Sequence, residues 1–277
     1  MNVHDRGLGL RREFASALAW GPTRSDVDFL EVVPDNWMGL GGESAQVLEA
    51  IAARYPMVAH SLSLSIGDAQ PLDWSYLGAV RSFLDRYGIE TYSDHVSMSR
   101  DSRGYLYELI PVPRNEASLR LMVEKVKAVQ DFLARPLALE NVSYYVEETG
   151  QMGEAEFLSR LVEDSGCALL LDINNVHVNA RNHGWNAREF LQALPEDAVS
   201  YYHMAGHLDL GPDAQMLDTH GTEVSAAVLQ LGALAVRRFG RQPVVLERDN
   251  FVPSLDELCV ELNAVHRAMT GSAGSPA

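Results

Sequence analysis

The chain has 277 residues, with 22 Lys and Arg side chains against 38 Asp and Glu side chains and a formal charge of −16. This acid excess gives no general attraction for nucleic acid or for an anionic membrane surface, because both are bound through Lys and Arg. Hydrophobic residues make up 47% of the chain and charged residues 22%, which is typical of a folded protein with a large core. The surplus carboxylates either form a solvated surface or include ligands that face inward to metal ions.

The two cysteines, Cys167 and Cys259, form neither a disulfide framework nor a CxxC metal site. Both lie in apolar patterns and are predicted to be buried. The N-terminal segment lacks the apolar stretch of a signal peptide, and no apolar run reaches the length of about 18 residues that a membrane span needs. We therefore expect a cytoplasmic protein.

Eight apolar runs of strand length alternate with amphipathic stretches along the chain. The predicted strands cover residues 8–10, 27–33, 57–61, 90–95, 137–142, 168–174, 199–205 and 244–247. The predicted helices cover residues 12–20, 43–55, 72–87, 116–134, 154–165, 187–194, 224–239 and 255–269, with Asn115, Asn186 and Ser254 as helix caps. Eight strand-then-helix units predict an α/β fold, a closed (β/α)8 TIM barrel.

The barrel is expected to form a single domain over residues 1–270, followed by a flexible tail over residues 271–277. Two connections, residues 97–113 and 207–222, are longer than a minimal loop between a strand and a helix. Long loops in a compact domain are usually functional.

Polar side chains stand at the carboxyl ends of the predicted strands, where barrel enzymes carry their catalytic groups. The second strand ends in Glu31, which is not counted among the candidate ligands. The candidates lie at later strand ends and in the loop that follows the seventh strand: His60, His95, Glu140, Asp172, His203, Asp218, His220 and Glu247.

Buried carboxylates and imidazoles are costly unless they are paired or bound to a cation. A mixture of the two donor types suits zinc, iron or manganese. The candidates are too many for one ion, so we predict two or three metal ions with Glu140 as a bridging carboxylate. Taken singly, each residue could instead be an ordinary hydrogen-bonded or salt-bridged group. For His177 and His183 the sequence is compatible with two roles, support of the ligands or contact with the substrate.

The order of these residues resembles the trinuclear metal barrels of the apurinic endonuclease and xylose isomerase-like superfamily. In those endonucleases a His follows the sixth-strand Asp by three residues, whereas this chain has Asn175 there. This difference and the negative charge speak against a zinc endonuclease.

A closer resemblance covers almost the whole chain. It is carried by the segments GLGLR (7–11), FLEVVPDNWMG (29–39), SDHVSMS (93–99), LENVSYY (139–145), LLLDINNVHVNARNHG (169–184), HMAGH (203–207), DTHG (218–221) and LERDNFVPSLDEL (246–258). Together they are similar to the multinuclear non-haem iron-dependent oxidative enzymes, whose best-known member is the methanobactin biosynthesis oxidase.

This resemblance implies an iron- and dioxygen-dependent oxidase that modifies cysteines of a ribosomally made precursor peptide. The products in the family include oxazolone–thioamide and thiooxazole groups. The implied cofactor is two or three iron ions in mixed Fe(II)/Fe(III) states, and a small partner protein is expected to bind the leader of the peptide. The three implied iron sites are His60, His95 and Glu140, then Glu140, Asp172, His203 and Glu247, then Asn175, Asp218 and His220.

Other residues near these motifs are expected to take part in catalysis, orient the ligands or line the entrance. The candidate catalytic residues are Glu140, Asn141 and His207. Asn141, Asn174 and His207 are also expected to orient the ligands, and Tyr144 and Tyr145 to line the entrance. His177 stands where the family often has Tyr. Two rival functions remain: a divalent-metal hydrolase or isomerase of the same superfamily, and a metal-loaded scaffold that binds peptide without turnover.

Overall fold

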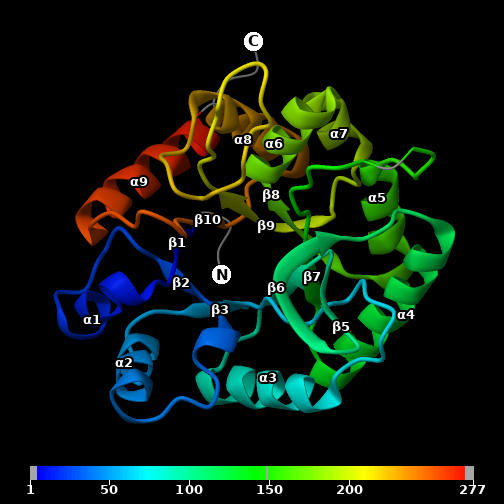
Figure 1. Cartoon of the computed structure of the whole chain (residues 1–277). Helices are drawn as coiled ribbons and strands as arrows, with labels where there is room; N and C mark the ends of the chain where they lie inside the picture. Colours follow the sequence, from blue (N-terminus) through cyan, green and yellow to red (C-terminus); the bar gives the residue numbers. More distant parts are fainter. Residues whose placement is uncertain (1–4, 148, 272–277) are drawn as a thin grey trace.

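The computed structural model describes residues 5–147 and 149–271, and eight parallel strands close into a barrel (Figure 1). Each strand pairs with the next around the ring in the order β1 (Arg6–Gly9), β10 (Val244–Leu246), β9 (Val199–Met204), β8 (Ala168–Asp172), β7 (Leu137–Glu140), β4 (Tyr92–His95), β3 (Met57–His60) and β2 (Phe29–Val32). The predicted (β/α)8 barrel is confirmed.

Helices surround the barrel and cover the apolar outer faces of its strands (Figure 1). They are α1 (Arg12–Trp20), α2 (Gly42–Ala52), α3 (Trp74–Tyr87), α4 (Glu116–Leu133), α5 (Glu154–Ser165), α6 (Ile173–His183), α7 (Ala187–Ala193), α8 (Ala226–Phe239) and α9 (Leu255–Gly271), with a short 3-10 helix η1 (Pro34–Asn36). No helix among the described residues is long and apolar enough to cross a membrane. Cys167 and Cys259 are free and buried, as predicted.

All three predicted helix caps are present. The Asn115 side chain accepts hydrogen bonds from two backbone N–H groups at the start of α4, and Asn186 accepts one at the start of α7. At the start of α9, the Ser254 N–H donates to Glu257 Oε2 at 2.9 Å while the Glu257 N–H donates to Ser254 Oγ at 3.4 Å. This reciprocal pair is a capping box.

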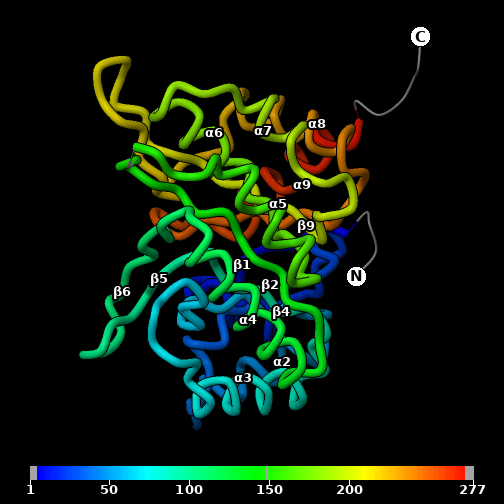
Figure 2. Tube along the Cα trace, turned by 90° about the vertical axis from the view of Figure 1, so that its right-hand side faces the viewer, coloured from blue at the N-terminus to red at the C-terminus, as the bar shows by residue number. Residues whose placement is uncertain are grey.

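The long segment 97–113 was predicted as a loop, and this is wrong: it folds into an antiparallel hairpin of β5 (Ser97–Asp101) and β6 (Gly104–Pro111). The turn is set by Asp101, which accepts the Arg103 N–H at 2.7 Å, and by Gly104, whose φ is +141°. Figure 2 shows this hairpin and the loop after β9 projecting from the same end of the barrel.

A second correction concerns the end of the sixth predicted strand. Asn174 was placed in the strand, but β8 ends at Asp172 and helix α6 begins at Ile173. Asp172 causes the switch because its side chain caps α6, accepting the Asn175 N–H at 2.6 Å. At the C-terminus, α9 includes Gly271, the first residue of the predicted tail, and the rest of that tail lies outside the described residues.

Two layers of side chains fill the inside of the barrel. The lower layer is an apolar cluster of Phe29, Val58, Ala138, Leu170, Tyr201 and Val245. Two positions further along each of these six strands stands a buried polar residue, in the same order Glu31, His60, Glu140, Asp172, His203 and Glu247. Residues two apart on a strand share a face, so the apolar floor sets the height and direction of this polar layer.

Gly7 leaves room for the largest side chain of the floor. A Cβ at this position would lie 2.3 Å from Cζ of the Phe29 ring. We expect Gly7→Ala to lower the free energy of unfolding by about 1–3 kcal/mol, because overpacking forces the ring out of place. Urea unfolding measures this change.

Gly78 in α3 is the matched control for this substitution, since a Cβ there meets no atom within 4 Å. Gly78→Ala is expected to stabilise the protein slightly, because Ala is the better helix former. The combination Gly7→Ala with Phe29→Leu should recover part of the loss. Equal effects of the two single substitutions would contradict the packing account.

Candidate metal centre

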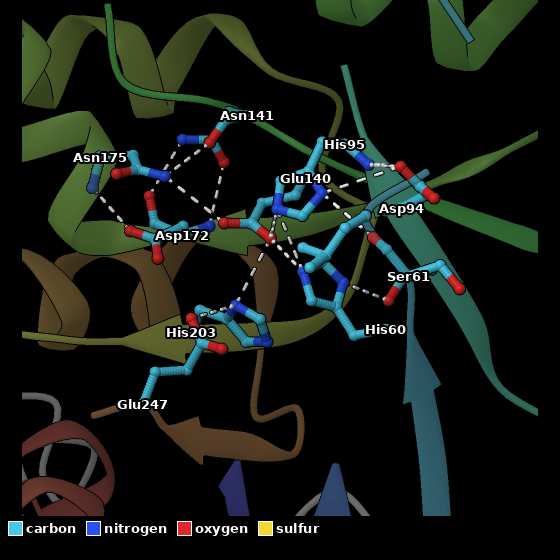
Figure 3. Close-up of polar contacts among 12 residues, drawn as sticks. His60, Ser61, Asp94, His95, Glu140, Asn141, Asp172, Asn175, His203 and Glu247 are labelled. Atoms are coloured by element: carbon cyan, nitrogen blue, oxygen red, sulfur yellow. Dashed lines mark hydrogen bonds and ion pairs between the residues drawn. The ribbon is translucent and has the colours of Figure 1, made fainter. Parts of the chain in front are cut away.

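Glu140 lies at the centre of the polar layer, at the end of β7. Its Oε2 atom is 3.0 Å from His60 Nε2, 3.3 Å from His95 Nε2 and 3.5 Å from His203 Nδ1. Figure 3 shows the three imidazoles directed at this carboxylate from β3, β4 and β9. All four side chains are buried. One carboxylate oxygen therefore stands among three imidazole nitrogens, which is the arrangement that a bridging ligand needs.

A second carboxylate, that of Glu247, extends the cluster away from β3. Its Oε2 atom lies 3.1 Å from His203 Nδ1 and 3.4 Å from His220 Nδ1. His220 Nε2 lies 3.9 Å from Asp172 Oδ2. Four groups have ligand atoms within 4.8 Å of one another: His60–His95–Glu140, Glu140–Asp172–His203, Asp172–His220–Glu247 and Glu31–His203–Glu247.

Five donor atoms of this cluster are buried and make no hydrogen bond of normal geometry within the described part of the chain, although oppositely charged groups lie close to four of them. They are Glu140 Oε2, Asp172 Oδ2, Asn175 Oδ1, His203 Nδ1 and His220 Nε2. Buried polar atoms without partners are rare and costly. Metal ions would satisfy all five together, and oxygen and imidazole donors suit divalent transition metals. The residues thus fit a site for more than one ion.

Protonation compensates the crowding of charge when no metal is bound. Burial raises the pKa of Asp172 well above its usual range, and the charge of Glu140 raises it further. Burial also acts to raise the pKa of Glu140. The positive charges of His95 and His203 outweigh this effect and hold the pKa well below its usual range. For His95, burial lowers the pKa, but Glu140 and Asp94 outweigh it and raise the pKa to about 9. Metal ions would take the place of these protons.

Asn141 and Asn175 tie the ends of β7 and β8 together. The Asn141 side chain accepts the Asp172 N–H at 2.9 Å and donates to the Asp172 carbonyl at 3.0 Å. Asn175 donates through Nδ2 to the Asn141 carbonyl at 3.0 Å, which leaves its Oδ1 unpartnered. The two amides hold Asp172 in place beside Glu140.

Asp218 and His220 lie in the long loop after β9 and contact each other, with 2.8 Å between Oδ1 and Nε2. Asp218 also accepts from Asn174 at 2.8 Å and from Ser143 at 3.0 Å. His207 Nδ1 lies 2.8 Å from Asn174 Oδ1 and does not line the cavity over the centre. The structure thus places His207 in a chain of hydrogen bonds that ends on Asp218, behind the cavity wall.

Glu31 is the residue that sequence reasoning left out of the ligand set. Its carboxylate lies 2.9 Å from His203 Nε2 and accepts the Tyr201 hydroxyl at 2.9 Å. Glu31 lies near the carboxyl end of the second predicted strand, so the signal that identified the other candidates applies to it as well. The side chain is buried in the polar layer and contacts Nε2 of His203, whereas Glu140 lies on the Nδ1 side of the same ring.

A cavity of about 510 Å³ lies over the cluster and is open to solvent. The hairpin contributes Tyr105 and Tyr107 to its wall, and Tyr145 lines it as predicted. Tyr144 does not line it, because its ring packs under the Arg114 guanidinium and stacks on His183.

His177 and His183, whose roles the sequence left open, lie on α6 and do not line the cavity. His183 Nε2 is 2.9 Å from the Tyr144 carbonyl, which explains its place in the packing behind the wall. The His177 ring lies 5.0 Å from that of His207. The geometry therefore gives neither histidine direct contact with the cluster.

Glu154, the first residue of α5, has an enclosed Oε2 atom without a hydrogen bond. Burial raises its pKa to about 7, against the opposing effect of Arg114. A carboxyl whose folded pKa exceeds its unfolded value of 4.5 stabilises the fold below that value and loses this effect as pH rises through about 7.

We therefore expect the free energy of unfolding of Glu154→Gln, measured relative to that of the wild type, to rise by up to about 3 kcal/mol from pH 4.5 to pH 8. Urea unfolding of both proteins across this range measures the difference. Glu156→Gln, an exposed position in the same helical turn, is the control and should show no such trend. A pH-independent difference for Glu154→Gln would contradict the burial argument.

With the geometry established, comparison with known proteins decides the family. A family model described as RiPP precursor modification enzyme MbnB/TglH/ChrH matches residues 5–270. The chain belongs to this family. The resemblance found in the sequence is thereby confirmed.

Curated proteins are similar to this chain over almost its whole length. A UPF0276 protein of Pseudomonas aeruginosa is 42% identical over 263 residues, covering 95% of this chain and 92% of the relative. A UPF0276 protein of Shewanella loihica is 40% identical over 264 residues, covering 95% and 94%.

Solved structures share the fold with this family member at low identity. A xylose isomerase-like TIM barrel protein from Mycobacterium smegmatis in complex with magnesium aligns with a TM-score of 0.61 at 15% identity, over 94% of this chain and 89% of that one. An IOLI protein with a zinc atom aligns with a TM-score of 0.60 at 13% identity, over 98% and 100%. These likenesses support the barrel architecture alone.

Proposed function

We propose that this protein is an iron- and dioxygen-dependent oxidase that modifies cysteine residues of a ribosomally synthesised precursor peptide. Membership of the RiPP precursor modification family supports an enzyme with a precursor peptide as substrate. The observation that carries the metal part is the convergence of three imidazoles on Glu140 Oε2, with unpartnered donor atoms around it. Such a cluster is costly to bury without cations.

We assign two or three iron ions, in mixed Fe(II)/Fe(III) states, to this cluster. When bound, iron supplies the redox chemistry with dioxygen that oxidation of a cysteine requires. His60, His95 and Glu140 would hold one ion, and Glu140 would share a second with Asp172, His203 and Glu247. Asn175, Asp218 and His220 would hold a third. Glu140 would act as the bridge, while Asn141 and His207 would be positioning residues that keep the donors in place.

The mouth of the cavity suits a peptide better than an enclosed small molecule. Exposed apolar side chains stand on the loops of this end of the barrel, with Tyr107 84% exposed, Phe251 89% exposed and Val146 79% exposed. Apolar groups gathered around a polar cavity indicate a surface that binds a larger partner. The peptide chain would rest on this surface while one cysteine reaches the cluster.

The proposal includes a cytoplasmic location, a small partner protein that presents the leader of the peptide, and a single catalytic domain over residues 1–270. It includes neither nucleic acid nor membrane as a partner. The precursor itself should be encoded as a short cysteine-bearing reading frame beside the gene.

The test is to incubate the iron-loaded protein with this cysteine-bearing peptide, its partner protein and oxygen, and to record the peptide mass. We expect a mass change and oxygen uptake, both absent when the cysteines are replaced by Ser. An unchanged peptide that stays bound would favour the scaffold. Turnover of sugars or abasic sites with zinc or manganese and without oxygen would favour the hydrolase or isomerase.

A further inference from the structure

A buried chain of hydrogen bonds runs beneath the proposed metal centre and connects two of its histidines. His60 Nδ1 lies 2.8 Å from Ser93 Oγ, and Ser93 Oγ lies 2.6 Å from the Tyr201 hydroxyl. Tyr201 donates to Glu31 Oε2 at 2.9 Å, and Glu31 Oε1 lies 2.9 Å from His203 Nε2. Every member of this chain is at most 3% exposed. We call these five residues the relay.

The direction of each hydrogen bond in the relay follows from the number of protons available. A carboxylate can only accept hydrogen bonds. Glu31 therefore accepts one from the Tyr201 hydroxyl and one from the Nε2–H of His203. The Tyr201 oxygen can then only accept from Ser93, because its single hydrogen is used. Ser93 also has one hydrogen. The Ala59 carbonyl lies 3.3 Å from Ser93 Oγ, but the shorter contact of 2.6 Å with the Tyr201 oxygen requires this hydrogen, so the Ser93 oxygen must accept the Nδ1–H of His60.

We propose that Glu31 sets the tautomers of two metal-binding histidines at once, His203 directly and His60 through Tyr201 and Ser93. With Nε2 protonated, His203 presents the lone pair of Nδ1, which lies 3.5 Å from Glu140 Oε2. With Nδ1 protonated, His60 presents the lone pair of Nε2, 3.0 Å from the same oxygen. Both lone pairs therefore face the point where the bridging carboxylate stands. The inference rests on the proposed metal centre.

Such control has a physical reason. A metal ion binds only the unprotonated nitrogen of an imidazole, and the hydrogen bond of the other nitrogen decides which one that is. His95 is held in a different way, since its Nδ1 lies 3.2 Å from the backbone carbonyl of Ser61. His95 contacts His60, with 3.2 Å between the two Nε2 atoms, but its tautomer is set outside the relay. The tautomer of His95 is therefore an internal reference that changes in the relay should leave unchanged.

Two variants separate the branches of the relay. Glu31→Gln replaces one acceptor oxygen by an NH2 donor, so it conflicts with Tyr201 or His203 and should disturb both histidines. Tyr201→Phe removes the hydroxyl and should disturb His60 while the contact between Glu31 and His203 remains. Tyr202→Phe is the matched control, since it removes a buried hydroxyl on the same strand that donates to the Gly240 carbonyl at 2.9 Å, outside the relay.

The experiment loads the protein, labelled with ¹⁵N at histidine, with Zn(II) as a diamagnetic probe and records long-range ¹H–¹⁵N spectra, which report ring tautomers. Signals are assigned from His→Gln variants. In the wild type we expect Nδ1–H for His60 and Nε2–H for His203. Zinc affinity, from chelator competition, should fall about 10–100-fold in Glu31→Gln and stay unchanged in Tyr202→Phe.

The outcomes distinguish the relay from the metal centre. Wild-type protein that binds no zinc would overturn the metal centre and the relay with it. Zinc binding of wild-type strength in Glu31→Gln, with both ring signals unchanged, would overturn the relay alone. If Glu31→Gln does not fold, Tyr201→Phe decides: a change at His60 without one at His203 or His95 supports the relay, and equal changes at all three contradict it.

Discussion

Glu140→Gln is expected to leave the barrel folded while the protein loses at least one of the proposed metal ions and the proposed oxidase activity. The carboxylate Oε2 lies within 3.5 Å of three imidazole nitrogens, so its replacement would remove a ligand from both ions that Glu140 is proposed to hold. The loss of activity should exceed the 10–100-fold that removal of an outer hydrogen-bond partner typically costs. Metal analysis and circular dichroism of the purified variant measure both effects.

The substitution also removes the charge that, together with Asp94, raises the pKa of His95 to about 9 against burial. In the metal-free variant this pKa should therefore fall. Glu154→Gln serves as the control, because it alters a carboxyl outside the metal cluster and should keep the full metal content. Full metal retention in Glu140→Gln would mean that Glu140 is not the bridge.

Asp172→Asn is expected to abolish binding of one ion with little effect on the stability of the metal-free protein. Asp172 has two tasks, since Oδ1 caps α6 and Oδ2 is left without a hydrogen bond beside His220. The Asn side chain keeps the capping oxygen and loses the second ligand oxygen. Burial raises the pKa of Asp172 well above its usual range, so the neutral amide resembles the protonated acid of the metal-free state.

Asp172→Ala is the comparison that separates the two tasks, because it also removes the cap and should cost about 1 kcal/mol more in unfolding free energy. Wild-type metal-free protein should lose stability as pH rises through the raised pKa of Asp172. Asp172→Asn should lack this contribution and keep only the loss that Glu154 causes. Urea unfolding with and without metal measures both. A variant Asp172→Asn that binds metal like the wild type would remove Asp172 from the ligand set.

The arrangement of the candidate donors was predictable because the barrel repeats one rule on six of its eight strands. His60, His203 and Glu247 each stand two positions beyond an inward-facing apolar residue, and apolar runs ending in a polar residue are visible in a single sequence. The eight-unit pattern then places those ends on one rim. Closure of the barrel follows from the same count.

Other features depend on contacts that no local pattern contains. Glu31 and His203 are 172 residues apart, and only the closed barrel shows that their side chains meet. Helix α6 was missed because its β-branched and Asn-rich sequence has weak helix propensity, and the Asp172 cap decides in its favour. The hairpin was predicted as a loop because its longer strand, β6, has no buried residue and alternates only weakly in exposure.

The central claim is that this cluster holds iron, and metal analysis of protein purified without oxygen tests it most directly. We predict at least two iron ions per chain and iron-dependent oxygen consumption once a cysteine peptide is added. Stoichiometric zinc, with no iron-dependent oxygen consumption on any cysteine peptide, would contradict the account.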